Sequence, residues 1–73
     1  MNAYFENAND NGYILMDTLF NLLVEEIDDV ISIHADGGFM LNIPKSDIES
    51  EIHEEDMDIY YMQDGSHIKL SLF

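Results

Sequence analysis

The sequence predicts an α+β fold in the order helix, hairpin, helix, hairpin: a four-stranded antiparallel sheet with two helices packed on one face. One observation behind this prediction is residues 13–29, where apolar residues recur at steps of three and four. The other is a pair of alternating apolar and polar segments, each interrupted by an Asp-Gly turn. Hairpins with one apolar face pack economically as one sheet covered by helices. We expect a single domain, 1–73.

The first helix is predicted over 13–29, after a loop or frayed start at 1–12 that is rich in Asn, Asp and Gly. Two adjacent apolar stripes on this helix are together wider than one sheet needs to bury. One flank is therefore predicted to be the dimerisation surface of a homodimer, and its residues are Leu15, Leu19 and Leu22. The alternative is a helix enclosed within its own fold.

The first hairpin is predicted over 31–43. A three-residue loop, Asp36-Gly37-Gly38, keeps the apolar residues of both strands on one face, whereas a two-residue loop mixes the faces. The expected cross-strand pairs are Ala35 with Phe39, Ile33 with Leu41, and Ile31 with Ile43.

The second helix is predicted over 46–55, because Ser46 and Glu49 have the spacing of a capping box. The second hairpin is predicted over 57–73, with a two-residue loop at Asp64-Gly65. Its expected pairs are Tyr61 with Ile68, Ile59 with Leu70, and Met57 with Leu72, which leaves Tyr60 and Met62 exposed on the opposite face.

The charge is extreme for a chain that is 47% hydrophobic: 16 Asp and Glu residues against two lysines and no arginine, a formal net charge of −14. Like charge disfavours direct binding to nucleic acid or to an anionic membrane and favours a basic partner. There is no cysteine, no apolar run of membrane-spanning length and no basic signal-like start. We therefore expect a cytoplasmic protein.

Residue chemistry argues against an enzyme. The chain lacks a cysteine nucleophile, an arginine to hold an anionic substrate and a phosphate-binding glycine loop. His34, His53 and His67 lack metal-ligand spacing. Asn7-x-Asn9-x-Asn11-Gly12 follows the first half of a calcium loop, but Thr18 stands where the loop needs glutamate. No catalytic residue, metal site or cofactor is predicted.

The acidic residues are predicted to bind the partner. One group closes the first helix, and the other covers the second helix and the start of the third strand, where acids at steps of four, three and four form a like-charged ridge. Charge beyond what solubility requires favours recognition, although a merely solvated face is the alternative. The predicted partner-binding residues are Glu25, Glu26, Asp28, Asp29, Asp47, Glu51, Glu54, Glu55 and Asp58.

Through this ridge, the acidic group at 25–29 and the near absence of basic residues, the chain resembles the small acidic phage proteins that imitate DNA and inhibit host DNA-binding proteins. The resemblance is one of class and carries no sequence motif. It implies a non-enzymatic inhibitor in the host cytoplasm whose partner is a basic DNA-binding protein. An HU-type nucleoid-associated protein or a sliding clamp is favoured, since an acidic dimer suits a basic, symmetric surface.

Two functional hypotheses follow. In the first, surface carboxylates dock on the DNA-binding site of another protein and block DNA binding. In the second, the chain is an acidic structural or regulatory interaction module that binds a partner through the apolar flank of its first helix, with Tyr60 and Met62 contributing.

Overall fold

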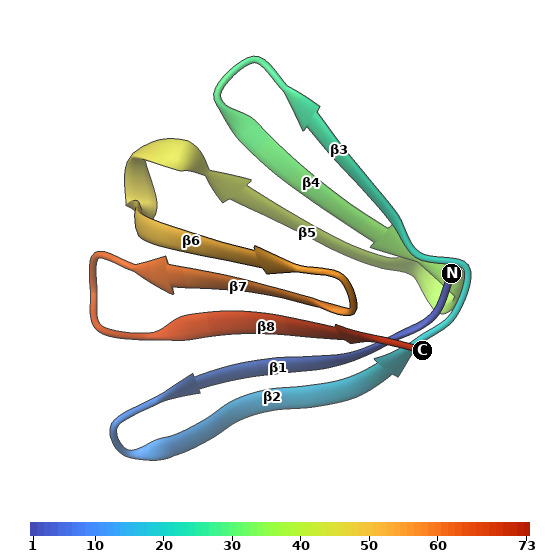
Figure 1. Cartoon of the computed structure of the whole chain (residues 1–73), viewed down its shortest axis with the longest axis horizontal. Helices are drawn as coiled ribbons and strands as arrows, with labels where there is room; N and C mark the ends of the chain where they lie inside the picture. Colours follow the sequence, from blue (N-terminus) through green and yellow to red (C-terminus); the bar gives the residue numbers. More distant parts are fainter.

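The structure, a computed structural model, describes all of residues 1–73 and consists of eight strands joined by short turns (Figure 1). Its only helical segments are two 3-10 turns, η1 (Asp36–Gly38) and η2 (Lys45–Asp47). No helix is long and apolar enough to cross a membrane. The strands are β1 (Ala3–Asn9), β2 (Gly12–Leu19), β3 (Leu23–Ile27), β4 (Val30–Ala35), β5 (Phe39–Pro44), β6 (Ile48–Glu54), β7 (Met57–Met62) and β8 (His67–Leu72).

The strands form two antiparallel sheets, a five-stranded sheet in the order β2-β1-β8-β7-β6 and a three-stranded sheet in the order β3-β4-β5. Consecutive strands pair with one another except at the β2–β3 and β5–β6 connections, where the chain passes from one sheet to the other, and β8 returns to pair with β1 (Figure 1). The termini therefore lie together: the Phe73 amide donates to the Asn2 carbonyl at 2.9 Å, and the Phe73 and Tyr4 rings stack with centroids 4.4 Å apart.

The core lies between the inner faces of the two sheets. Alternate residues of β4 and β8 are buried, as expected for strands with one face toward a core. Only 10 of the 73 residues are buried, so the core is small. Its main cluster comprises Ala3, Phe5, Leu19, Ile31, Ile33, Ile43, Tyr60, Ile68 and Leu70.

The α+β prediction is wrong, and the first helix shows why. Residues 13–29 form β2, a corner and β3, followed by a tight turn. Asn21 and Asp28 have positive φ angles of 53° and 54°, a conformation that Asn and Asp tolerate and that ends regular structure. The three-and-four spacing arose by coincidence across two strands and a corner.

The second predicted helix and the predicted loop at 1–12 are also corrected. Within 46–55, Ser46 and Asp47 lie in η2, which has no side-chain cap, and β6 begins at Ile48. Within 1–12, β1 pairs with both β2 and β8, so this segment is a central strand rather than a frayed start. Its Asn-rich end forms the β1–β2 turn.

The first hairpin is confirmed in position and register: β4 pairs with β5 as Ala35–Phe39, Ile33–Leu41 and Ile31–Ile43. Gly37 and Gly38 have φ angles of 81° and 80°, which only glycine adopts freely. The aligned apolar faces of the two strands determined this register.

The second hairpin forms, but its predicted register is wrong by one residue. Tyr60, not Tyr61, pairs with Ile68, and Tyr61 pairs with His67. A one-residue slip moves every side chain to the other face. Tyr60 is thus buried in the core and Met62 packs against it, whereas Met57, Ile59 and Tyr61 lie on the outer face.

The predicted dimerisation flank is not a surface of this fold. Leu19 is buried in the core, and Leu22 packs against it. Leu15 alone is exposed.

Candidate functional site

Three acidic turns lie together at one end of the molecule. The Lys45 amide at the start of η2 donates to the Asp29 carbonyl in the β3–β4 turn at 2.8 Å. The Gln63 amide in the β7–β8 turn donates to the Asp47 carbonyl in η2, also at 2.8 Å. We call this group the acidic end, and its carboxylates are Asp28, Asp29, Asp47 and Asp64, all exposed.

The acidic end includes a shallow hollow and a rigid turn. The hollow, about 260 Å³ in volume, is lined by Asp47, Met62, Gln63 and Asp64. The Ser66 amide and hydroxyl both donate to Oδ1 of Asp64, at 2.9 and 2.5 Å. These bonds stabilise the charged carboxylate and lower the pKa of Asp64. Asp64 is therefore a fixed negative charge at this end.

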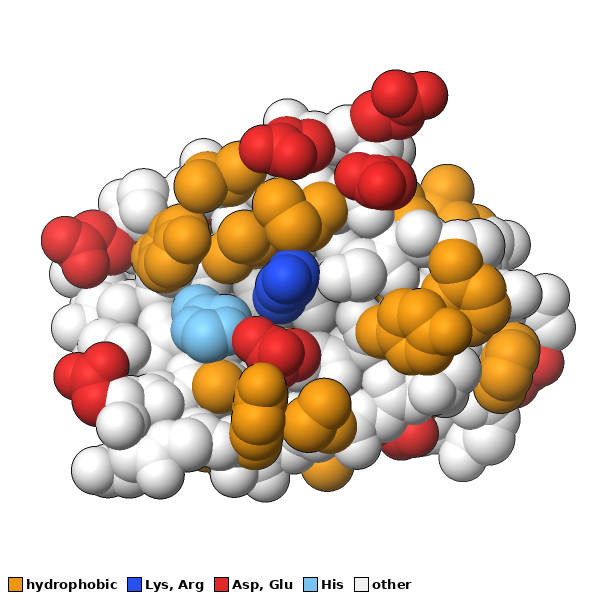
Figure 2. Space-filling model, turned by 60° about the horizontal axis from the view of Figure 1, so that its bottom comes forward, with side chains coloured by type: hydrophobic (Ala, Val, Ile, Leu, Met, Phe, Trp, Pro, Cys, Tyr) orange, Lys and Arg blue, Asp and Glu red, His pale blue; other side chains and the backbone are white.

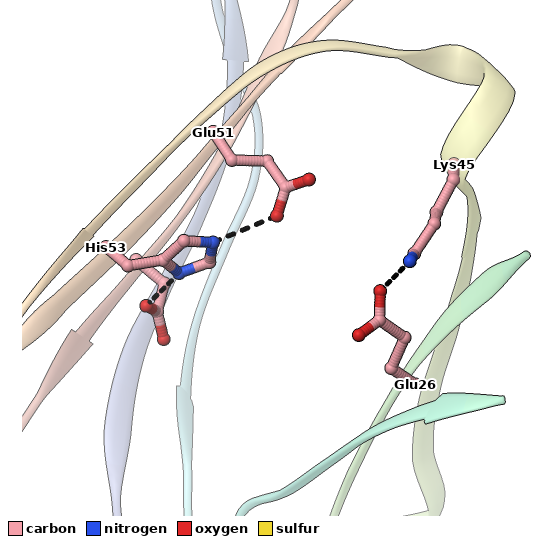
Figure 3. A network of polar contacts seen from close by, with 5 residues as sticks. Glu26, Lys45, Glu51 and His53 are labelled. Carbon is pink, nitrogen blue, oxygen red and sulfur yellow. Dashed lines mark hydrogen bonds and ion pairs between the residues drawn. The ribbon is translucent and has the colours of Figure 1, made fainter.

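Few cations balance the acids. Lys45 in η2 forms an ion pair with Glu26 on β3 (Figure 3). Lys69 lies on the outer face of the five-stranded sheet, opposite Glu6. Neither lysine forms an ion pair with a carboxylate of the acidic end, so the negative potential there is not neutralised internally.

His53 on β6 bridges two carboxylates (Figure 3). Its Nδ1 lies 2.7 Å from Oδ1 of Asp58, and its Nε2 lies 2.9 Å from Oε1 of Glu51. Only the imidazolium form donates from both nitrogens at once. The hydrogen bond to Asp58 and then that to Glu51 are the main causes that raise the pKa of His53 above its ordinary value. The two carboxylates therefore favour the protonated form of His53.

Beneath this bridge, Tyr60 is buried, and its ring contacts the His53 ring edge to face with centroids 5.7 Å apart. Burial, followed by the nearby charges of Asp58 and Glu51, raises the pKa of Tyr60 to about 12. Tyr60 therefore stays neutral at physiological pH.

The His53 bridge predicts a pH-dependent contribution to stability. Because the folded pKa is raised, the contribution is complete below about pH 6.5, the ordinary histidine value, and is lost as the pH rises through the folded pKa. Half-exposed side chains limit it to a few tenths of a kcal/mol. Urea unfolding measured from below about pH 6.5 to above the folded pKa of His53 should show this loss of stability. The loss should be absent in His53→Gln.

An NMR titration of His53 checks the cause of this effect. Asp58→Asn should lower the pKa of His53 more than Glu51→Gln does, because the Asp58 hydrogen bond is the larger cause. Equal pKa values in the wild type and both variants would show that the bridge does not form in solution.

The predicted partner-binding residues are divided between regions of the fold. Asp28, Asp29 and Asp47 come together at the acidic end. Glu25 and Glu26 lie on β3, and Glu54 and Glu55 lie where β6 ends, near the opposite end. Glu51 and Asp58 are bound to His53. The helical ridge does not exist, because β6 directs successive side chains to opposite faces.

The outer face of the five-stranded sheet carries a lysine and a histidine beside a carboxylate (Figure 2). His67 Nε2 lies 2.6 Å from Oε2 of Glu6, and Lys69 is the cross-strand neighbour of Glu6. Figure 2 shows a lysine, a histidine and a carboxylate together, surrounded by apolar side chains. The register places these surrounding residues on the same face: Tyr4, Tyr13, Met16, Ile52, Met57, Ile59 and Tyr61.

Sequence reasoning missed two parts of these surfaces. Asp64 was assigned only to a turn, although an Asp-x-Ser spacing suits a side chain that caps its own turn. The Glu6–His67 pair joins residues 61 positions apart, and no local pattern reports it.

The structure contains no group of three or more His, Cys, Asp or Glu side chains placed to hold a metal ion. Comparisons of the chain with protein-family models, curated proteins and solved structures give no match.

Proposed function

We propose that the protein is a non-enzymatic inhibitor that imitates DNA: it places its carboxylates on the basic DNA-binding surface of another protein and blocks DNA binding. The observation that carries this proposal is the acidic end, where four exposed carboxylates gather from three turns with no lysine ion-paired to any of them. A surface of this kind attracts a basic partner and repels nucleic acid.

The rigidity of the acidic end suits the imitation of DNA. Its backbone groups are bonded to one another across the turns, and Asp64 is held by Ser66. Carboxylates on a rigid frame lose little conformational entropy on binding. Strand β6 starts from the acidic end and adds Glu49, so the charge extends along the edge of the sheet.

Competition with DNA tests the proposal. A labelled duplex bound to a purified HU-type nucleoid protein should be displaced by the protein, with an apparent affinity that falls steeply as salt is added. Affinity capture from a bacterial lysate, with and without competing duplex, extends the test to other DNA-binding proteins, sliding clamps included. Capture of partners whose DNA occupancy stays unchanged would contradict the proposal.

A further inference from the structure

The four sheet edges differ in their protection against pairing with another chain. Exposed edges are normally protected by charged residues, proline or β-bulges. Edge strand β6 carries three glutamates, β3 carries two, and β5 ends in Pro44. Edge strand β2 has an irregularity in its pairing with β1, where Ile14 has no partner, but it carries only one acid, Asp17. This acid follows an uncharged run that is 66, 57, 47 and 59% exposed: Tyr13, Ile14, Leu15 and Met16.

The backbone of this edge is also unpaired. Strand β2 pairs only with β1, and no backbone hydrogen bond outside the sheets involves Gly12–Leu19. The Thr18 amide donates to Oδ1 of Asp17, its neighbour, at 2.8 Å and therefore faces away from β1. Met16, two residues earlier, directs its amide the same way. Figure 1 shows β3 diverging from β2 beyond their shared corner, so no other strand lies beside this edge.

We propose that β2 pairs antiparallel with β2 of a second copy of the chain, so that the two five-stranded sheets become one continuous sheet. The distribution of charge favours a second copy of the chain as the partner of β2. Two copies that each carry −14 repel one another, and they approach best where the surface is uncharged, which Tyr13–Met16 is. A basic partner is drawn instead to the acidic end.

Two-fold symmetry also favours a second copy as the partner of β2. In a two-fold interface each copy contributes the same strand, so the apolar run and unpaired backbone of one β2 lie against those of the other. Antiparallel pairing through Tyr13–Met16 places the two Asp17 carboxylates at opposite ends of the paired segment. A hollow of about 400 Å³ beside this edge, lined by Tyr4, Phe5, Met16, Asp17 and Thr18, can accept side chains of the second copy.

Sedimentation of the full chain over a concentration series tests the proposal. We expect a species of twice the 8.4 kDa chain mass, strengthened by added salt because salt screens the repulsion between copies. Added salt should strengthen the dimer but weaken binding to the basic partner of the proposed function. Either proposal can therefore fail without the other. A chain that stays monomeric at high concentration and high salt would overturn the dimer.

A matched pair of variants locates the interface. Met16→Lys should raise the dimer dissociation constant about tenfold or more, because it puts a charge in the apolar contact. Met40→Lys makes the same change at a similarly exposed methionine, 63% against 59%, on the other sheet, and should change the constant less than about twofold. Ile14→Lys should repeat the Met16→Lys result. Equal effects of Met16→Lys and Met40→Lys would overturn the assignment.

Amide exchange distinguishes edge pairing from packing of the outer faces. Protection of the Met16 amide should rise with protein concentration, since it gains a hydrogen bond across the interface. A dimer in which this amide stays unprotected would show that the copies meet by another surface.

Discussion

Leu19→Ala should lower the free energy of unfolding by about 2–5 kcal/mol, the usual cost of removing a fully buried leucine side chain from a core. Leu19 is 2% exposed and belongs to the cluster between the two sheets. In so small a core the lost contacts have few replacements, so the variant should be close to unfolded at physiological temperature. Urea unfolding followed by circular dichroism measures the change.

Leu15→Ala is the control for this prediction. Leu15 stands four residues earlier on the same strand and is 47% exposed, so its replacement should cost less than about 1 kcal/mol. Residues four apart share one face in a strand as they do in a helix, so the expected difference between the two variants comes from their burial alone. Similar losses from the two replacements would therefore contradict β2 as the structure describes it.

The sequence predicted the fold well only where the strand pattern and the turn chemistry agreed. For β4 and β5, one face is wholly apolar and the turn contains two glycines, so both position and register were determined. For β7 and β8, the sequence pattern favoured the register with a wholly apolar face, whereas the structure pairs Tyr60 with Ile68 and Asp58 with Leu70. Tyr60 is buried in the core cluster between the sheets, and the local sequence does not contain that tertiary packing.

The helix predictions failed for a related reason. Strand β2 is an edge strand with apolar residues exposed on both faces, so it lacks the alternation by which strands are recognised. The same feature is the basis for the proposed pairing of β2 with a second copy. The exposed apolar residues that make β2 hard to recognise as a strand from the sequence are therefore the same residues that the proposed dimer would bury.

The candidate site could be predicted in composition but not in arrangement. The excess of acids was evident, and Asp28, Asp29 and Asp47 were among the expected partner-binding residues. Their gathering with Asp64 depends on the meander, in which every second turn lies at the same end of the sheets. The proximity of these turns follows from the strand order, and the strand order can be predicted only after every strand has been recognised in the sequence.

The two proposed binding surfaces differ in charge. The acidic end has carboxylates without amino-group partners, and the β2 edge has an uncharged apolar run. A dimer through β2 carries two acidic ends related by the two-fold axis. Two such ends would bind a symmetric basic partner more tightly than one, provided that the spacing allows both to engage.

The triple replacement Asp28→Asn, Asp29→Asn and Asp47→Asn should weaken binding to the basic partner by roughly 100-fold at low salt, because three ion pairs at up to about 1 kcal/mol each are lost. Asparagine keeps the shape of the side chain and tolerates the positive φ angle of Asp28, so the fold should persist. Displacement of a labelled duplex from the partner measures the effect.

The matched control removes the same number of charges near the opposite end, through Glu54→Gln, Glu55→Gln and Asp56→Asn. Both triple variants have the same net charge, so non-specific attraction falls equally in both. If the acidic end is the binding surface, the control should lose less than about tenfold, because distant charges act only through a screened potential. Equal losses would show recognition by overall charge alone, and no loss in either variant would contradict DNA imitation altogether.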